Sequence, residues 1–349
     1  MLTHTRHPYL RVARMALLLL VAGLSGVSTG TEGDRPVFSG RATAVTAKVL
    51  GLALPPLADT GYFEGEEFVP PTQCTDQGVA VPQLSVQAQL LCATTAGQGD
   101  HSFSEAHVAA LNADVAGVPV TATVLRSEAS AGCSAFAPVV DGSADLADAR
   151  VGSVSIDPDP LVTPRNQPIP IPLVPGAYFI VGERTTRFHG NYGDITVTAL
   201  RVVVPGPVPG TDTDVSFARV HADAKCQGRP VCPQPRFVTG GGFLSGKRHF
   251  VIAFREGDLD WGHLMYSDKA AGVKITADKP FTTTDVYPLP NADGGGTVTG
   301  KTASGAPFRS EIIDTGEPGR QDWFLLDVAG AEGNLEGGNI QVHKPCRDQ

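Results

Sequence analysis

Two stretches of sequence decide the fold: RSEASAGC at 126–133 and RVHADAKC at 219–226. Both follow the pattern R-x-x-A-x-A-x-C. In an extended strand, residues i, i+2 and i+4 point to one face, so each stretch places two alanines and a terminal cysteine together. We expect two strands with small inward residues to lie side by side, joined by a Cys133–Cys226 disulfide.

The chain has an even set of cysteines: Cys74, Cys92, Cys133, Cys226, Cys232 and Cys346. An even number in an exported chain is typical of disulfides. No C-x-x-C occurs, which argues against a thiolate metal site. The six allow fifteen pairings, and sequence alone does not choose among them. With the repeated strand as a guide, we expect a local Cys74–Cys92 bond and a Cys232–Cys346 bond that closes the C-terminal region.

A second pattern, A-[LV]-x-x-x-V-x-G, occurs at 44–51, 110–117 and 199–206. Each copy is rich in strand formers and ends at a glycine, which favours a turn. The uneven spacing argues against a solenoid. We interpret the copies as a reused hairpin unit, with chance similarity among Ala/Val-rich strands as the alternative.

The distribution of proline and short strands predicts an all-β protein with two β-sandwich or barrel-like domains, at 31–226 and 237–349. Prolines at every second position of 168–172 predict an edge or polyproline II segment, because proline nitrogen cannot donate. Residues 227–236 (QGRPVCPQPR) are typical of a linker. Beyond it, short strands separated by turn signals favour a sandwich or barrel. They are expected at 249–254, 272–277, 295–300, 307–314, 322–328 and 339–343.

The first thirty residues have the order of a secretory signal: a basic stretch at 1–14, an apolar run at 15–24 and small residues at 25–30. The apolar run is too short to span a bilayer. We expect cleavage near Gly30 and a secreted or cell-surface-associated protein, with no membrane insertion after cleavage. A buried N-terminal helix is the alternative.

The charge balance is acidic, with a formal net charge of −9. Removing the first thirty residues takes away three arginines and no acid, which leaves 24 basic against 36 acidic side chains, or −12. A nucleic-acid partner requires a basic surface, and none is evident. We therefore expect an extracellular protein or glycan as partner.

Several segments resemble the choice-of-anchor P family, which comprises exported bacterial surface proteins. They are Ser39–Gly51, the SEA at 104–106, RSEASAGC and Ala199–Cys226. The tail resembles a small domain that often follows it, through Gly240–Phe243, Gly246–Lys247, Gly262–Tyr266, Asp314–Gly319 and Gly337–His343. The resemblance implies a β fold and a place at the cell surface, and it supplies no catalytic residues. The chain departs from the family in showing no anchor motif.

The mature chain contains no intact catalytic motif. GGFLSGKR at 241–248 approaches a phosphate loop, but Arg248 replaces the hydroxyl that would reach Mg²⁺. The only G-x-S-x-G, at 26–30, lies in the expected signal region. His249, His263 and His343 would converge on zinc only if their strands were neighbours. We therefore expect no enzymatic activity and no cofactor.

Two weaker candidates for binding lie in the tail. The acids Glu256, Asp258 and Asp260 are candidates for a weak calcium site, although their spacing does not fit a compact calcium loop. Trp261 and Tyr266 are candidate aromatic contacts for sugar faces. The sequence thus favours a non-catalytic structural or binding protein of the bacterial envelope or matrix. The alternatives are a carbohydrate- or calcium-binding module and a secreted hydrolase with an unfamiliar site.

Overall fold

The computed structural model describes residues 37–64, 72–98, 101–134, 137–157, 159–160, 162–226, 236–316 and 319–343. These residues form three antiparallel sheets and one 3-10 turn, η1 (Asp327–Ala329). The expected all-β fold class is confirmed. Within these ranges, no helix has the length and apolar character needed to cross a membrane. The expected signal peptide, Cys232, Cys346 and all of the expected linker except Arg236 lie outside the described residues.

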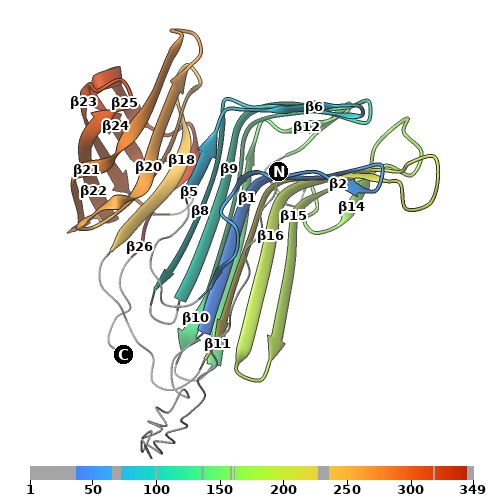
Figure 1. Cartoon of the computed structure of the whole chain (residues 1–349), viewed down its shortest axis with the longest axis horizontal. Helices are drawn as coiled ribbons and strands as arrows, with labels where there is room; N and C mark the ends of the chain where they lie inside the picture. The colour runs from blue at the N-terminus through green and yellow to red at the C-terminus, as the bar shows by residue number, and fades with distance from the viewer. Residues whose placement is uncertain are drawn as a thin grey trace, which may run out of the picture. The chain divides into compact units, whose positions relative to one another are not determined.

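The first two sheets are made by residues 37–226 (Figure 1). The first sheet contains β1 (Val37–Val49), β2 (Leu52–Ala53), β3 (Leu57–Asp59), β4 (Phe63–Glu64), β14 (Pro168–Pro170), β15 (Tyr178–His189), β16 (Tyr192–Val204) and β17 (Thr213–Lys225). The second contains β5 (Thr72–Thr75), β6 (Val79–Val81), β7 (Leu84–Gln87), β8 (Leu90–Gln98), β9 (His101–Val115), β10 (Val118–Ser134), β11 (Ala137–Ala147), β12 (Arg150–Val151) and β13 (Val154–Ser155). The proline strand β14 pairs only with β15 and lies at an edge, as predicted.

The two sheets pack face to face, and β10 and β17 meet at their centre. The alanines of both R-x-x-A-x-A-x-C copies are buried between the sheets, and their small size lets the backbones approach. The Ser127 hydroxyl donates across the interface to the Ala218 carbonyl at 2.7 Å. The Cys133–Cys226 disulfide is confirmed. The expectation that its strands are neighbours is wrong, because β10 and β17 face each other from different sheets and the disulfide joins the layers.

The long strands of both sheets bend part-way along their length (Figure 1). Pairing in the first sheet runs from Thr43↔Arg219 to Val45↔Phe217 and passes over Ala44 and Ala218. Ala218 and its counterpart in the second sheet, Ala110, both have a φ of 51°, a left-handed conformation that interrupts the extended backbone. The three copies of A-[LV]-x-x-x-V-x-G begin at Ala44, Ala110 and Ala199, and the strand pairing passes over each of these residues. The repeat therefore corresponds to a bend followed by a strand and a turn.

The third sheet is a curled half-barrel with its own apolar core. It contains β18 (Phe237–Leu244), β19 (Arg248–Arg255), β20 (Asp258–Asp268), β21 (Val273–Leu289), β22 (Ala292–Thr302), β23 (Pro307–Asp314), β24 (Trp323–Leu326), β25 (Ala331–Asn334) and β26 (Gly337–His343). Each of the six strands predicted in this region overlaps one of these. At the edge strand β26, the amides of Ile340 and Val342 donate to the carboxylates of Asp322 and Asp314 at 2.8 and 2.7 Å.

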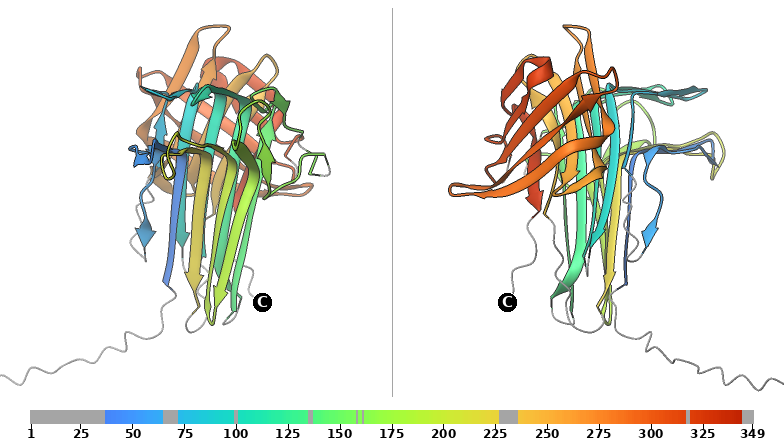
Figure 2. Two further views of the ribbon diagram at one scale, coloured as in Figure 1. Left: turned by 90° about the vertical axis from the view of Figure 1, so that its right-hand side faces the viewer. Right: turned by 60° about the vertical axis from the view of Figure 1, so that its left-hand side comes forward.

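The third sheet packs on the outer face of the second (Figure 2). Two apolar clusters join them, one around Cys92 and Met265 and one around Ala96 and Trp261. An added Cβ on Gly241 of β18 would lie 2.9 Å from the His107 ring, so the two sheets approach closely here. One face of the second sheet therefore contacts the first sheet, and the other is covered by the third.

Candidate functional site

A polar pocket of about 210 Å³ lies on the outer face of the first sheet, where its strands bend. We call it the bend pocket. Its lining comes from β1, β16, β17 and the segment before β4: Arg41, Thr43, Thr46, Tyr62, Thr196, Arg219, Val220 and His221. Because Thr43 and Thr46 flank the bend at Ala44, the pocket joins the straight and the turned part of β1.

One wall of the pocket is held in place by an ion pair and an aromatic ring. Arg41 makes a two-pronged contact with Asp59, with both N–O distances 2.8 Å. The Thr43 hydroxyl donates to the same carboxylate. The guanidinium of Arg41 lies 5.1 Å from the ring centre of Tyr62, a cation–π contact. Tyr62 remains 64% exposed, so much of its surface is open to a ligand.

The neighbouring strand β17 contributes His221 and Arg219 to the pocket. The two ring nitrogens of His221 lie 3.1 Å from the Thr196 hydroxyl and 3.0 Å from Asp223, which fixes the ring. Arg219 is exposed, and no carboxylate pairs with it among the residues that the structure describes. Since Asp59 already neutralises Arg41, Arg219 is the cation of this pocket that is open to a ligand.

A second polar cluster lies buried between the second and third sheets. Arg126 has no exposed surface and contacts Glu105, Glu128 and Asp145 at 2.7, 2.6 and 3.2 Å. Burial disfavours the charged form of Glu105, but Arg126 and His107 outweigh it and lower the pKa of that carboxyl. Burial is also the main cause of the raised pKa of Glu128. This cluster has a structural role, because its polar groups are used in pairing with one another.

The aromatic residues expected to meet a sugar lie elsewhere. Trp261 and Tyr266 are 3% and 2% exposed, so the expectation that these two rings meet a sugar at the surface is wrong. Trp261 packs between the second and third sheets, with its ring 5.9 Å from that of Phe237 and Arg255 over its face. The acidic turn before it does not hold it at the surface, because β20 turns the ring toward β8.

The three acids proposed for calcium do not form a ligand cluster within the described part of the chain. Asp258 contacts Arg255 at 3.4 Å and accepts the amides of Asp260 and Trp261, each at 3.2 Å. Its oxygens thus stabilise the turn between β19 and β20. Asp260 is exposed and Glu256 half-buried, as is usual in a solvated turn.

The three histidines of the tail occupy separate environments. His343 lies 2.9 Å from the Thr239 hydroxyl and stacks on Phe237, while His249 lies beside Phe243. Only His263 belongs to a group with metal-ligating atoms among the residues described: its partners are Cys74 and Cys92. Convergence of the three imidazoles on zinc was therefore the wrong grouping. The expected Cys74–Cys92 disulfide is present, and GGFLSGKR forms a strand–turn–strand instead of a phosphate loop.

No family model matches the chain, and no curated protein or solved structure is significantly similar to it. The resemblance to choice-of-anchor P proteins stays a prediction.

Sequence reasoning missed the bend pocket. Its residues are spread from 41 to 221, and only the fold brings them together. The sequence held one signal for this pocket: Arg219 and Arg126 are the first residues of the two copies of R-x-x-A-x-A-x-C. The sequence does not reveal which of the two arginines is left exposed.

Proposed function

We propose that this protein is a non-catalytic, secreted binding protein of the bacterial cell envelope or extracellular matrix, and that its bend pocket holds a carboxylate-bearing sugar residue of a polysaccharide. The observation that carries the proposal is that the exposed Arg219 and the exposed ring of Tyr62 line the same pocket. The two disulfides support an oxidising compartment.

The charge and shape of the pocket favour an acidic sugar. A guanidinium recognises a carboxylate through two parallel hydrogen bonds. The half-buried hydroxyls of Thr46 and Thr196 offer polar contacts for sugar hydroxyls. An aromatic ring at the rim offers an apolar face for the ring of the sugar. The volume of the bend pocket lies below the ~300–1,000 Å³ of sites for drug-sized ligands. This favours a single sugar unit of a longer chain as the ligand.

Calorimetric titration with oligogalacturonate, a carboxylated saccharide, tests the proposal. We expect binding by the unaltered protein and none to neutral dextran. Arg219→Gln should weaken binding by about tenfold or more, because a charge-assisted hydrogen bond contributes about 1.5–3 kcal/mol. Tyr62→Ala should weaken it through loss of the ring. The control is Arg150→Gln, which removes an exposed arginine from β12 in the second sheet and should leave affinity unchanged.

Equal affinity in Arg219→Gln and Arg150→Gln would refute the pocket as the binding site. Prolonged incubation with the same saccharide tests the non-catalytic part. We expect its chain length to stay constant. Shortened products would support the alternative of a secreted hydrolase.

A further inference from the structure

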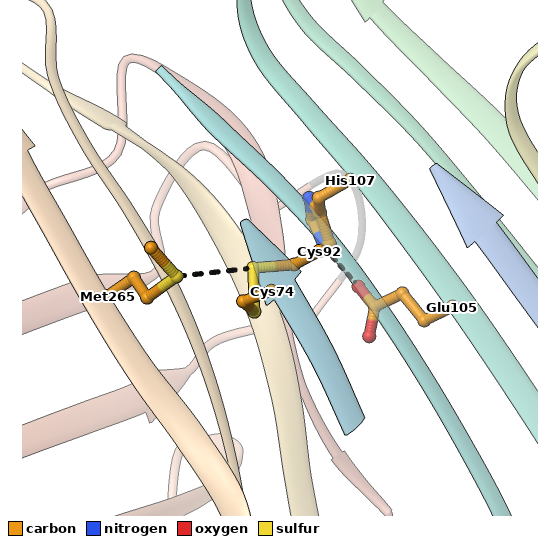
Figure 3. Close-up of a disulfide and its surroundings, with 5 residues drawn as sticks. All are labelled: Cys74, Cys92, Glu105, His107 and Met265. Atoms are coloured by element: carbon orange, nitrogen blue, oxygen red, sulfur yellow. Dashed lines mark hydrogen bonds and ion pairs between the residues drawn. A yellow bond between two sulfur atoms is a disulfide. The ribbon is translucent and has the colours of Figure 1, made fainter. Parts of the chain in front are cut away.

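The Cys74–Cys92 disulfide lies at the contact between the second and third sheets, beside two further ligand-type side chains. Cys74 on β5 and Cys92 on β8 are direct partners across the strands. The Met265 sulfur lies 3.8 Å from that of Cys92, and a dashed line joins the two in Figure 3. The ligating atoms of Cys74, Cys92 and His263 all lie within 4.8 Å of one another. His263 and Met265 are two residues apart on β20, so their side chains point to the same face of the strand.

The His263 ring has the properties of a metal ligand. Neither of its ring nitrogens is accessible to solvent, and neither has a hydrogen-bond partner among the residues that the structure describes. Buried polar atoms without partners are rare in folded proteins and call for an explanation. A neutral imidazole is the form that binds a metal.

The identity of the side chains selects the metal. Two cysteine sulfurs, a thioether and an imidazole make a soft set, and soft ligands favour Cu(I). Zinc sites use Cys, His and carboxylate, so the thioether of Met265 discriminates against zinc. Met265 is also the only methionine after residue 15, and it lies with its sulfur against this disulfide. The surrounding side chains Leu90, Ala109 and Val251 are apolar and offer no competing oxygen ligand.

We propose that reduction of the Cys74–Cys92 disulfide creates a Cu(I) site formed by Cys74, Cys92, His263 and Met265. Two equivalents of a small thiol, RSH, supply two electrons and two protons, the S–S bond breaks, and RSSR leaves. Cu(I) then binds both sulfurs and displaces their protons to solvent. The disulfide and the metal therefore exclude each other, and the site reports the redox state around the protein. Cys74 is partly exposed on the short strand β5, which gives the thiol access. This site is independent of the bend pocket.

Anaerobic copper titration of the whole protein tests the site. The oxidised and the phosphine-reduced protein compete for Cu(I) with the chelator bicinchoninate. We expect one tight equivalent per reduced chain that the oxidised chain lacks. The double variant Cys74→Ser/Cys92→Ser, reduced in the same way, corrects for copper held by the other four cysteines and should lack this equivalent. Partners of metal ligands already change metal affinity by about 10- to 100-fold, so Met265→Leu and His263→Gln should each weaken binding by at least about tenfold.

His249→Gln is the matched control, because it removes another buried histidine of the third sheet and should leave affinity unchanged. Copper uptake by the reduced double-serine variant equal to that of the unaltered protein would overturn the proposal. X-ray absorption of the copper-loaded, unaltered protein decides the ligand set without any substitution. Nitrogen together with sulfur around the copper supports the site, and sulfur alone refutes it.

Discussion

The two copies of R-x-x-A-x-A-x-C have the same sequence pattern and opposite surroundings at their first residue. In β10, Arg126 is fully buried and contacts three carboxylates. In β17, Arg219 is exposed and lines the bend pocket. The alanines behave alike in both copies, since all four are buried between the sheets. The motif thus determines the inward face of its strand and leaves the outward face to the rest of the fold.

The third sheet causes the difference. It covers the outer face of the second sheet, where the charges of Glu105 and Arg126 act on the half-buried His343 of β26. Among the residues that the structure describes, none covers Arg219 on the outer face of the first sheet, and its side chain is exposed. An arginine under a protein layer needs acids beside it, and Glu105 and Glu128 supply them. An arginine on an open face does not, and it is available to a ligand.

The largest expected effect comes from cutting the bond that joins the two copies. The Cys133–Cys226 disulfide closes a separation of 93 residues, against 18 for Cys74–Cys92. In the chain-entropy model, loops of these sizes contribute about 4–5 and about 3 kcal/mol. Urea unfolding should show that Cys133→Ala/Cys226→Ala loses more stability than Cys74→Ala/Cys92→Ala. The reverse order would mean that the tie between β5 and β8 matters more than the tie between the layers.

The next largest effect compares the loss of stability when each of the two arginines is replaced. Arg126→Leu leaves buried carboxylates without their cation, which costs about 3–5 kcal/mol of unfolding free energy. Arg219→Leu changes an exposed residue and should stay within about 0.5 kcal/mol. Both are measured by urea unfolding followed by circular dichroism. Equal losses in the two variants would contradict the covering role of the third sheet.

The sequence predicted the inward half of this arrangement and missed the outward half. Alternation in RSEASAGC and RVHADAKC was enough to orient the alanines and to pair Cys133 with Cys226. The bend at Ala110 appeared only as the first residue of a repeated strand pattern, and the bend at Ala218 did not appear at all, because a left-handed alanine has no distinct sequence signal. The surroundings of Arg126, Arg219 and Trp261 depend on which faces the sheets cover. That is a property of tertiary packing, which local pattern does not contain.

The covering sheet should itself respond to pH through Asp322. Burial raises the pKa of this carboxyl to about 6, above its ordinary 3.8. The folded state then binds a proton more tightly than the unfolded chain, so this contribution is present at low pH and is lost as pH rises from about 4 to 6. We expect a loss of about 1–2 kcal/mol in urea unfolding followed by tryptophan fluorescence, since both tryptophans lie in the third sheet. Asp322→Asn should have a flatter profile over this range, and an unchanged slope would assign the effect to another group.

The smallest expected effect tests whether the left-handed backbone of Ala218, at the bend in β17, is strained. Ala218 and Ala222 are both fully buried, so a change to glycine removes the same methyl group. Only Ala218 has a left-handed backbone, which costs an L-residue about 1–2 kcal/mol and glycine little. In Ala218→Gly, the loss of the buried methyl group and the greater freedom of the unfolded chain both lower stability. Relief of the left-handed backbone strain offsets them, so the free energy of unfolding should change by less than about 0.5 kcal/mol. Ala222→Gly has no such relief and should lose about 1–2 kcal/mol. Equal losses would show that the bend imposes no backbone strain, and that the alanine is selected there by packing alone.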